Sequence, residues 1–214
     1  CSSPEQQQTL LFPFRADNGF LYVDRTGKTV IPSQFAEAGV FSEGRAPVSI
    51  GEQKERWGFI TETGTFAIPA SYIAVTGFSD GLAWAVAENN PPAAISSDGQ
   101  TVFTFAEAET VRIFSEGLAA FSTIQDEQER WGYADRKGRI VIVPQFYAAL
   151  EFSNGLAAVR NKEGKWGYTD DSGNLIIPFQ FDEAGPFSNG MAVAGFDNRN
   201  GIIGRDGKFI INPQ

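Results

Sequence analysis

Residues 166–178 read WGYTDDSGNLIIP: a short apolar segment, a polar turn that ends in glycine, and a second apolar segment that ends in proline. The same phrase returns in weaker form, with Trp-Gly pairs at Trp57 and Trp131. The turn glycines fall at Gly27, Gly64, Gly99, Gly138, Gly173 and Gly207. Their spacing of roughly 35 residues is typical of a protein built from one repeated supersecondary unit.

A second landmark, the pattern Phe-Ser-x-Gly, has the same period. Its copies begin at Phe41, Phe78, Phe114, Phe152 and Phe187. Two independent landmarks with one period predict six tandem modules, from near Leu10 to Asn212. The segment from Phe105 to Phe114 is longer than its counterparts, so we expect extra connector residues after the third module.

Each module is predicted to form three short antiparallel strands, because β-branched and aromatic residues dominate the apolar runs and no run has a helical stripe. The turn before the third strand starts with Asp, which bonds backbone N–H groups two residues on, and ends with Gly, which supplies a positive φ. We therefore expect an all-β array of six three-stranded meanders. Such an array forms either a propeller-like closed ring or an open superhelix, and the lack of a polar cap at either end slightly favours the closed form.

The paired tryptophans have two possible roles. A module this small cannot build a core alone, so we expect Trp131 and Trp166 to be buried against neighbouring modules. Each would remove about 150–250 Å² from water. The alternative is a row of exposed rings that stack on a ligand.

Trp84 lies outside this pattern, because it falls in the first strand of a module that has no Trp-Gly pair. One interpretation is compensation, in which Trp84 fills the volume of the missing tryptophan. The other is an exposed aromatic side chain at a contact surface, as a protein interface or a sugar platform would use.

Two charged loops of similar composition precede Trp-Gly pairs. Their charged residues include Glu52, Lys54 and Arg56 in the first loop and Asp126, Glu129 and Arg130 in the second. Both loops read as solvated hairpin tips. They also are candidate contacts for one protein partner, because equivalent loops would lie on the same rim of the array.

The chain has no histidine, which excludes serine and cysteine triads and histidine-ligated metal sites. A single cysteine cannot form a metal cluster, and no glycine-rich loop has phosphate-binding form. Paired carboxylates, as glycosidases use, are still possible, and Glu37 and Glu183 occupy matching connector positions. We expect no catalytic residue, no cofactor and no metal site.

The net charge of −9, without any basic cluster, argues against nucleic acid and against direct binding to anionic lipid headgroups. No apolar stretch approaches the ~20 residues that a membrane-spanning helix needs. The one cysteine is Cys1, and a polar stretch follows it, as at the mature N-terminus of a bacterial lipoprotein. We therefore expect residues 1–9 to be a flexible tether with a lipid on Cys1, and residues 10–214 to be a single repeat domain.

The phrase at residues 165–178, followed by Phe181-Asp182-Glu183-Ala184 and by the Phe-Ser-x-Gly copy at Phe187, closely resembles the bacterial WG-repeat family. The resemblance covers nearly the whole chain after the tether and implies a β-rich repeat without carried-over catalytic residues. By analogy it implies a scaffold or interaction role.

From these observations we expect a non-catalytic, lipid-anchored, extracytoplasmic protein that binds a protein partner, such as a membrane complex of the cell envelope. It would contact the bilayer only through Cys1 and would bind no nucleic acid. The alternative is a carbohydrate-binding protein or a carboxylate-dependent glycoside hydrolase.

Overall fold

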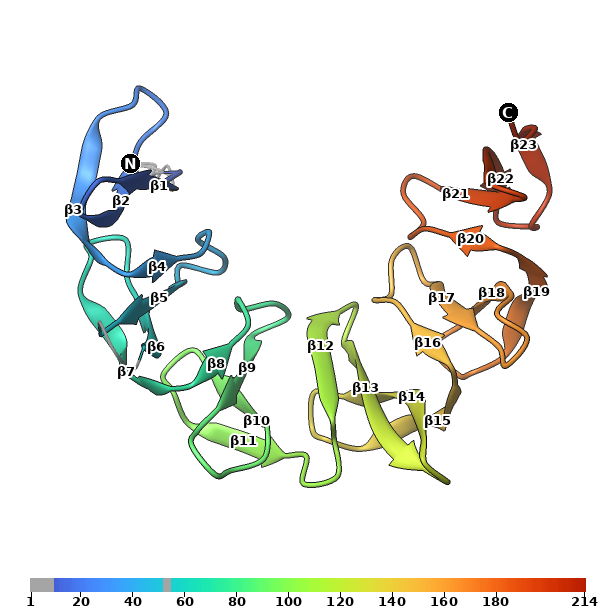
Figure 1. The fold of residues 1–214 in the computed structure, drawn as a ribbon, viewed down its shortest axis with the longest axis horizontal. Coiled ribbons are helices and arrows are strands. Elements are labelled where there is room, and N and C mark those ends of the chain that lie inside the picture. Colours follow the sequence, from blue (N-terminus) through green and yellow to red (C-terminus); the bar gives the residue numbers. More distant parts are fainter. Residues whose placement is uncertain (1–9, 52–54) are drawn as a thin grey trace, which may run out of the picture. The chain divides into compact units, whose positions relative to one another are not determined.

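The computed structural model of this chain describes residues 10–51 and 55–214. The described residues form strands, turns and loops, with no helix among them. The strands make six antiparallel sheets that follow one another along the chain (Figure 1). The chain divides into two compact units, Cys1–Val102 and Phe103–Gln214. The expected all-β array of six modules is therefore confirmed, whereas the extent of a single domain over residues 10–214 stays a prediction.

The first unit contains three sheets. The first sheet consists of β1 (Phe12–Ala16), β2 (Gly19–Val23) and β3 (Thr29–Phe35). The second consists of β4 (Glu37–Ala38), β5 (Ala46–Ile50), β6 (Arg56–Ile60) and β7 (Phe66–Tyr72). The third consists of β8 (Ala74–Val75), β9 (Leu82–Val86), β10 (Ala93–Ser96) and β11 (Thr101–Thr104), whose end reaches into the second unit.

The second unit contains the other three sheets. The fourth sheet consists of β12 (Thr110–Ser115), β13 (Leu118–Gln125), β14 (Gln128–Asp135) and β15 (Ile140–Phe146). The fifth consists of β16 (Ala148–Ala149), β17 (Ala157–Arg160), β18 (Trp166–Thr169) and β19 (Leu175–Phe181). The sixth consists of β20 (Glu183–Ala184), β21 (Met191–Phe196), β22 (Arg199–Gly204) and β23 (Phe209–Ile211).

Five sheets contain a fourth strand that the sequence pattern did not predict. It is formed by the connector from the preceding module, as where Glu37 and Ala38 of β4 pair with Ser49 and Val48 of β5. Such a strand is only two residues long in four sheets. In the fourth sheet the extra connector residues extend it to six residues, as β12.

The hydrophobic core lies between sheets. We call the face of a sheet that packs on the next sheet its forward face, and the opposite face its back face. One core cluster joins the forward face of the fifth sheet, with Leu156, Ala158, Tyr168 and Ile177, to the back face of the sixth, with Ala192, Ala194 and Ile203. Equivalent clusters join the first sheet to the second, the second to the third, and the fourth to the fifth. The expectation that a module packs against its neighbour is therefore confirmed within both units.

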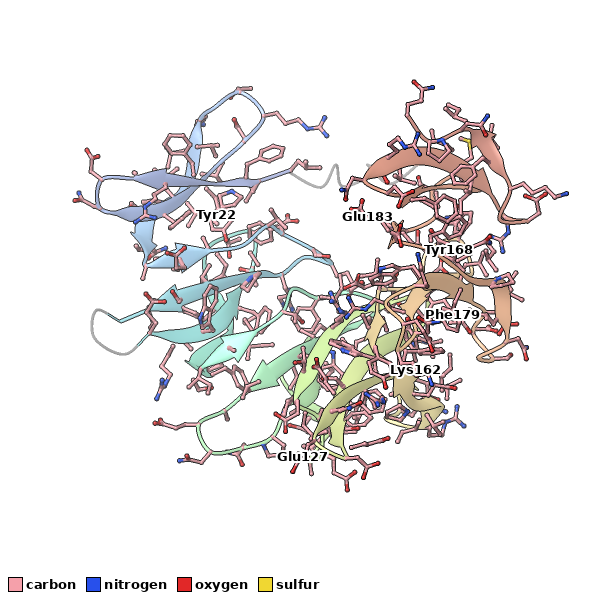
Figure 2. The ribbon with its side chains drawn as sticks, turned by 45° about the vertical axis from the view of Figure 1, so that its right-hand side comes forward. Tyr22, Glu127, Lys162, Tyr168, Phe179 and Glu183 are labelled. Atoms are coloured by element: carbon pink, nitrogen blue, oxygen red, sulfur yellow. The ribbon has the colours of Figure 1, made fainter. Side chains whose placement is uncertain are left out.

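The aromatic residue two positions after each paired tryptophan, or at the equivalent Tyr22 of the first module, is the centre of these junctions. It packs on the Phe of the next Phe-Ser-x-Gly corner, in the pairs Tyr22–Phe41, Phe59–Phe78, Tyr133–Phe152 and Tyr168–Phe187, with ring centroids 4.8–5.1 Å apart. The Tyr168 hydroxyl donates a hydrogen bond of 2.9 Å to the Gly185 carbonyl, and the Tyr22 hydroxyl donates one of 2.8 Å to Gly39 (Figure 2). Burial raises the pKa of both hydroxyls, which keeps them neutral donors.

From the second module on, the turn glycine rests on the third strand of the preceding module. A Cβ built on Gly207 would lie 2.7 Å from the side chain of Ile177, and one on Gly64 would lie 2.8 Å from Ile31. Both glycines also have a positive φ, of +75° and +81°. Glycine is therefore required at this position for two reasons: the turn needs a positive φ, and a Cβ would collide with the neighbouring sheet.

The Phe-Ser-x-Gly corners form a chain of hydrogen bonds from module to module. The third residue of each corner has a positive φ, between 51° and 54° at Glu43, Asp80, Glu116, Asn154 and Asn189. The Glu116 carboxylate accepts hydrogen bonds of 2.7 Å from the N–H groups of Asn154 and Gly155 in the next corner. The Asn154 side chain accepts one from Gly190 in the corner after that, at 3.1 Å. The side chain at this position thus links its module to the next one.

Candidate partner-binding surface

The glycine of the Trp-Gly pair places the tryptophan beside a bulge in the third strand. A Cβ on Gly132 or Gly167 would lie 2.4 or 2.6 Å from the carbonyl oxygen of Ile142 or Ile177, where the strand register shifts. Trp131 is buried, as expected, in the cluster between the fourth and fifth sheets. Trp166 is only half-buried and packs on the edge of its core. The expectation that both tryptophans pack against neighbouring modules is confirmed, and Trp166 lies at the edge of its core because the tyrosine two residues later takes the centre.

Trp84 is 1% exposed, so its assignment as a candidate partner contact is wrong. It pairs across β9 and β10 with Ala94. In the fifth sheet the equivalent pair is Ala158 and Tyr168, with the large side chain on the opposite strand. Trp84 is buried, as the compensation interpretation expects, but it stands in the cross-strand pair that contains the core tyrosine and not at the position of the missing paired tryptophan.

The hairpin between β13 and β14 presents the second charged loop of the sequence. Its turn consists of Asp126 and Glu127, of which Glu127 is labelled in Figure 2. Both residues have a positive φ, as a tight two-residue hairpin turn requires. Behind the tip, the Arg130 guanidinium lies 3.8 Å from the centre of the Tyr147 ring. The same guanidinium donates hydrogen bonds to the Tyr147 hydroxyl at 2.7 Å and to the Gln128 side chain at 2.6 Å. Arg130 is thereby held in one position.

The contacts continue from Tyr147 to the paired tryptophan of the fifth sheet. Arg160 donates a hydrogen bond of 3.4 Å to the Tyr147 carbonyl, and its guanidinium lies 5.7 Å from the centre of the Trp166 ring. Arg160 and Trp166 are also cross-strand partners in β17 and β18. We call Arg130, Tyr147, Arg160 and Trp166 the Arg–aromatic strip. All four residues are half-buried, which leaves part of each side chain accessible.

Of this strip, the sequence singled out Arg130 as a candidate partner contact and Trp166 as a paired tryptophan. Tyr147 and Arg160 were missed, although a signal existed. Tyr147 lies 17 residues after Arg130, and Asp182 lies 17 residues after Lys165, with which it forms a salt bridge. The position before the paired tryptophan is therefore basic in both sheets, and its partner recurs at a fixed distance along the chain.

The other candidate contacts have different surroundings. Arg56 forms a salt bridge of 2.5 Å with Glu88, in the turn after β9. Asp126 and Glu129 are exposed on their hairpin, as expected of a solvated tip. Glu52, Lys54 and the lipidation candidate Cys1 lie outside the described residues.

The two connector carboxylates considered for catalysis have modest local contacts. The Glu183 carboxylate accepts a hydrogen bond of 3.3 Å from the Asn200 side chain, and the Glu37 backbone N–H donates one of 3.0 Å to the Ser49 hydroxyl. The carboxylates in the turns have a lowered pKa. A hydrogen bond from the Thr26 side chain lowers the pKa of Asp24, and one from the Asn174 side chain lowers the pKa of Asp170. A general acid needs a shift in the opposite direction.

A surface cavity of about 370 Å³ lies in the second unit, where the extra connector residues precede β12. Phe105 and Phe121 form part of its lining, with ring centroids 4.6 Å apart. Glu107 and Gln125 are among its polar residues.

Within residues 10–51 and 55–214, no group of three or more Cys, Asp or Glu residues is placed to hold a metal ion. The described residues also contain no helix that is long and apolar enough to cross a membrane.

The sequence matches the model of the WG containing repeat family in four places, at residues 22–53, 57–90, 131–166 and 166–199. These four stretches together cover more than half of the chain. Residues 91–130 and the residues from 200 onward lie outside them, and the first of these stretches begins where the third module has Pro92 and Ala93 in place of a Trp-Gly pair. No curated protein matches the sequence.

Three solved structures share the fold at low sequence identity. A computationally designed protein, Ika8, has a TM-score of 0.61 at 12% identity, over 98% of this chain and 72% of the designed one. BamB from Moraxella catarrhalis has a TM-score of 0.56 at 10% identity, over 98% and 74%. A eukaryotic initiation factor has a TM-score of 0.63 at 11% identity, over 100% and 64%.

Proposed function

Because this chain belongs to the WG containing repeat family, we propose that it is a non-catalytic repeat protein that binds a protein partner through the Arg–aromatic strip. We also propose that a lipid on Cys1 holds it at the extracytoplasmic face of a bacterial membrane. The observation that carries the first proposal is the unbroken series of contacts from Arg130 through Tyr147 and Arg160 to Trp166.

The composition of the strip supports a protein partner. Trp, Tyr and Arg are the residues most often found as binding hot spots, because they combine a large apolar area with directed hydrogen bonds. In this strip the side chains already hold one another, by the 2.7 Å bond between Arg130 and Tyr147 and by the stacking of Arg160 on Trp166. Less side-chain entropy is therefore lost on binding than with free arginines.

The repeat architecture supports the same proposal. The core side chains of each module are used to bind the neighbouring module, so that the sheets act as a rigid support for residues on their rims. Side chains on rigid strands bind more precisely than side chains on loops. With Trp84 buried, the sugar platform considered for it has no support.

A partner-capture experiment tests the strip. Detergent-solubilised envelope is passed over immobilised wild type and over the Arg130→Ala/Tyr147→Ala double variant. We expect at least a tenfold loss of the captured partner, which corresponds to about 1.4 kcal/mol. The matched control is Arg199→Ala, which removes an exposed arginine at the equivalent hairpin position of the sixth sheet. If the double variant captures as much partner as wild type and its melting temperature is unchanged, the partner binds outside the Arg–aromatic strip.

The anchor and the absence of catalysis have separate tests. The mass of the intact native protein should include two or more acyl chains, since one chain binds a bilayer only weakly. A free thiol on Cys1 in that material contradicts the anchor. A panel of glycosides should show no turnover. Turnover by wild type that the Glu37→Gln/Glu183→Gln variant loses would identify a glycosidase instead.

A further inference from the structure

The basic residue before the paired tryptophan has a different partner in the fourth sheet than in the fifth. In the fifth sheet Lys165 forms a salt bridge with Asp182, 17 residues further along the chain. In the fourth sheet Arg130 finds Tyr147 at the same distance of 17 residues. A neutral hydroxyl therefore stands where the neighbouring module has a carboxylate.

Arg130 is held in place without being neutralised. Its guanidinium donates hydrogen bonds to the Gln128 side chain at 2.6 Å, to the Glu129 backbone carbonyl at 3.1 Å and to the Tyr147 hydroxyl at 2.7 Å. All three acceptors are uncharged groups. These bonds fix the position of the side chain, but they leave its positive charge and some of its N–H groups available.

Arg160 is in the same condition at the other end of Tyr147. It donates one hydrogen bond, of 3.4 Å, to the Tyr147 backbone carbonyl, and it stacks on the Trp166 ring. Its buried Nε–H has no acceptor within the part of the chain that the structure describes. Two guanidinium groups without a carboxylate thus lie at the hydroxyl end and at the backbone end of Tyr147.

The fourth sheet shows which group completes such a site. There the Arg112 guanidinium lies 5.0 Å from the centre of the Trp131 ring, much as Arg160 lies over Trp166. Arg112 also forms a salt bridge of 3.4 Å with Glu151. An arginine on a paired tryptophan therefore binds a carboxylate where this chain supplies one. The planar guanidinium matches that group in geometry, and the bonds are strengthened by charge.

We infer that the Arg–aromatic strip binds an acidic segment of the partner, with one carboxylate on Arg130 and another on Arg160. This inference rests on the proposed function, because it requires the strip to be the binding surface. The net charge of −9 repels an acidic segment over most of the protein. Recognition therefore depends on short-range contacts with these two arginines, which makes it specific for this strip.

A synthetic acidic peptide and two matched variants test the carboxylate. The probe is fluorescein-labelled hexaglutamate, and its binding is followed by fluorescence anisotropy near neutral pH. Tyr147→Asp gives Arg130 a carboxylate from this chain, as Asp182 does for Lys165. Tyr147→Asn removes the same ring without adding a charge. We expect Tyr147→Asp to bind the probe about tenfold more weakly than Tyr147→Asn, at similar melting temperatures. Equal binding by the two variants would overturn the inference.

Three controls separate this site from a general effect of charge. Arg130→Gln/Arg160→Gln should lose about tenfold in affinity for hexaglutamate, whereas Arg199→Gln, at an exposed arginine of the sixth sheet, should bind as wild type does. Labelled hexaglutamine should bind much more weakly than hexaglutamate. A loss with Arg199→Gln as large as that with the double variant, or equal binding of both peptides, would overturn the inference. So would a single-stranded DNA oligonucleotide that competes as well as unlabelled hexaglutamate.

The capture experiment on solubilised envelope distinguishes this inference from the proposed function. If Arg130→Ala/Tyr147→Ala loses the partner but Tyr147→Asp and Tyr147→Asn capture equal amounts, the strip is the binding surface and the acidic segment is overturned. If Tyr147→Asn captures more than Tyr147→Asp, both statements are supported. If the alanine variant captures as much as wild type, both are overturned.

Discussion

The third and fifth sheets each pair one large and one small buried side chain across two strands, but the large side chain is on the first strand of the pair in one sheet and on the second in the other. In the fifth sheet the large side chain is Tyr168 on β18 and the small one is Ala158 on β17. In the third sheet Trp84 on β9 is large and Ala94 on β10 is small. All four side chains are 0–1% exposed. Both sheets therefore combine one large and one small side chain in this cross-strand pair, although the large residue is on a different strand in each, and the module forms in the third sheet without a Trp-Gly pair.

Removing the large side chain from either sheet is expected to have the largest effect. Trp84→Ala and Tyr168→Ala should each lower the free energy of unfolding by about 3–5 kcal/mol, because each change leaves a cavity at a fully buried aromatic side chain. If the strands are interchangeable, Ala94→Tyr should recover part of the loss in the Trp84→Ala background. Urea unfolding measures both effects. A further loss of stability in the double variant would show that the third sheet has a packing of its own.

A smaller loss is expected from Gly167→Ala, which tests the bulge opposite the Trp-Gly glycine, a position at which the third sheet has Ala93. Its Cβ would lie 2.6 Å from the Ile177 carbonyl, so β18 and β19 must move apart. We expect a loss of about 1–3 kcal/mol, typical of overpacking. Gly77→Ala is the control, since Gly77 has open space around it and no positive φ. Equal stability of the two variants, measured by thermal unfolding, would count against the close approach.

The second sheet has Phe59 at the position of the core tyrosine, so the contribution of the tyrosine hydroxyl can be separated from that of the ring. Tyr168→Phe removes the hydrogen bond to the Gly185 carbonyl and should cost about 1 kcal/mol. The ring contact with Phe187 is retained, so the fold should be unchanged. A loss as large as that of Tyr168→Ala would mean that the hydroxyl, and not the ring, holds the junction.

The smallest effect concerns pH. A hydrogen bond from the Asn174 side chain and the backbone N–H groups of the turn lower the pKa of Asp170 in the folded protein. A lowered folded pKa stabilises the protein above the unfolded pKa of about 3.9, and this contribution is lost as pH falls below it. Asp170→Asn should therefore reduce the acid-induced fall in melting temperature. An identical fall in both proteins between pH 5 and pH 2 would contradict this assignment.

The sequence predicted the modules because their turns depend on local chemistry. Asp170 and Gly173 define a hairpin loop without help from any distant residue, and Asp170 accepts the expected bonds from the backbone of Ser172 and Asn174. Trp84 could not be placed in this way. Its environment depends on the residue across the strand pair, Ala94, and that register follows from the packing of whole sheets.

The candidate surface was predictable only in part, for a similar reason. Arg130 was visible as a charge beside a Trp-Gly pair, but its partner Tyr147 belongs to the connector of the next module. The two meet because β14 and β15 form a hairpin that returns the chain to its starting edge. Such contacts between modules become predictable only when residues a fixed number of positions apart, here 17, are compared from module to module.

The placement of the core between sheets has a consequence for how such a gene lengthens. A duplicated module brings one forward face and one back face, so it inherits a fitting junction on each side without any new substitution. The corner residue, such as Glu116 or Asn154, is copied with it and already bonds the backbone of whatever corner follows. Whole-module duplication is therefore nearly neutral at the moment it occurs, whereas an insertion of half a module would leave two unmatched faces. Selection for length can act on this array in steps of one sheet.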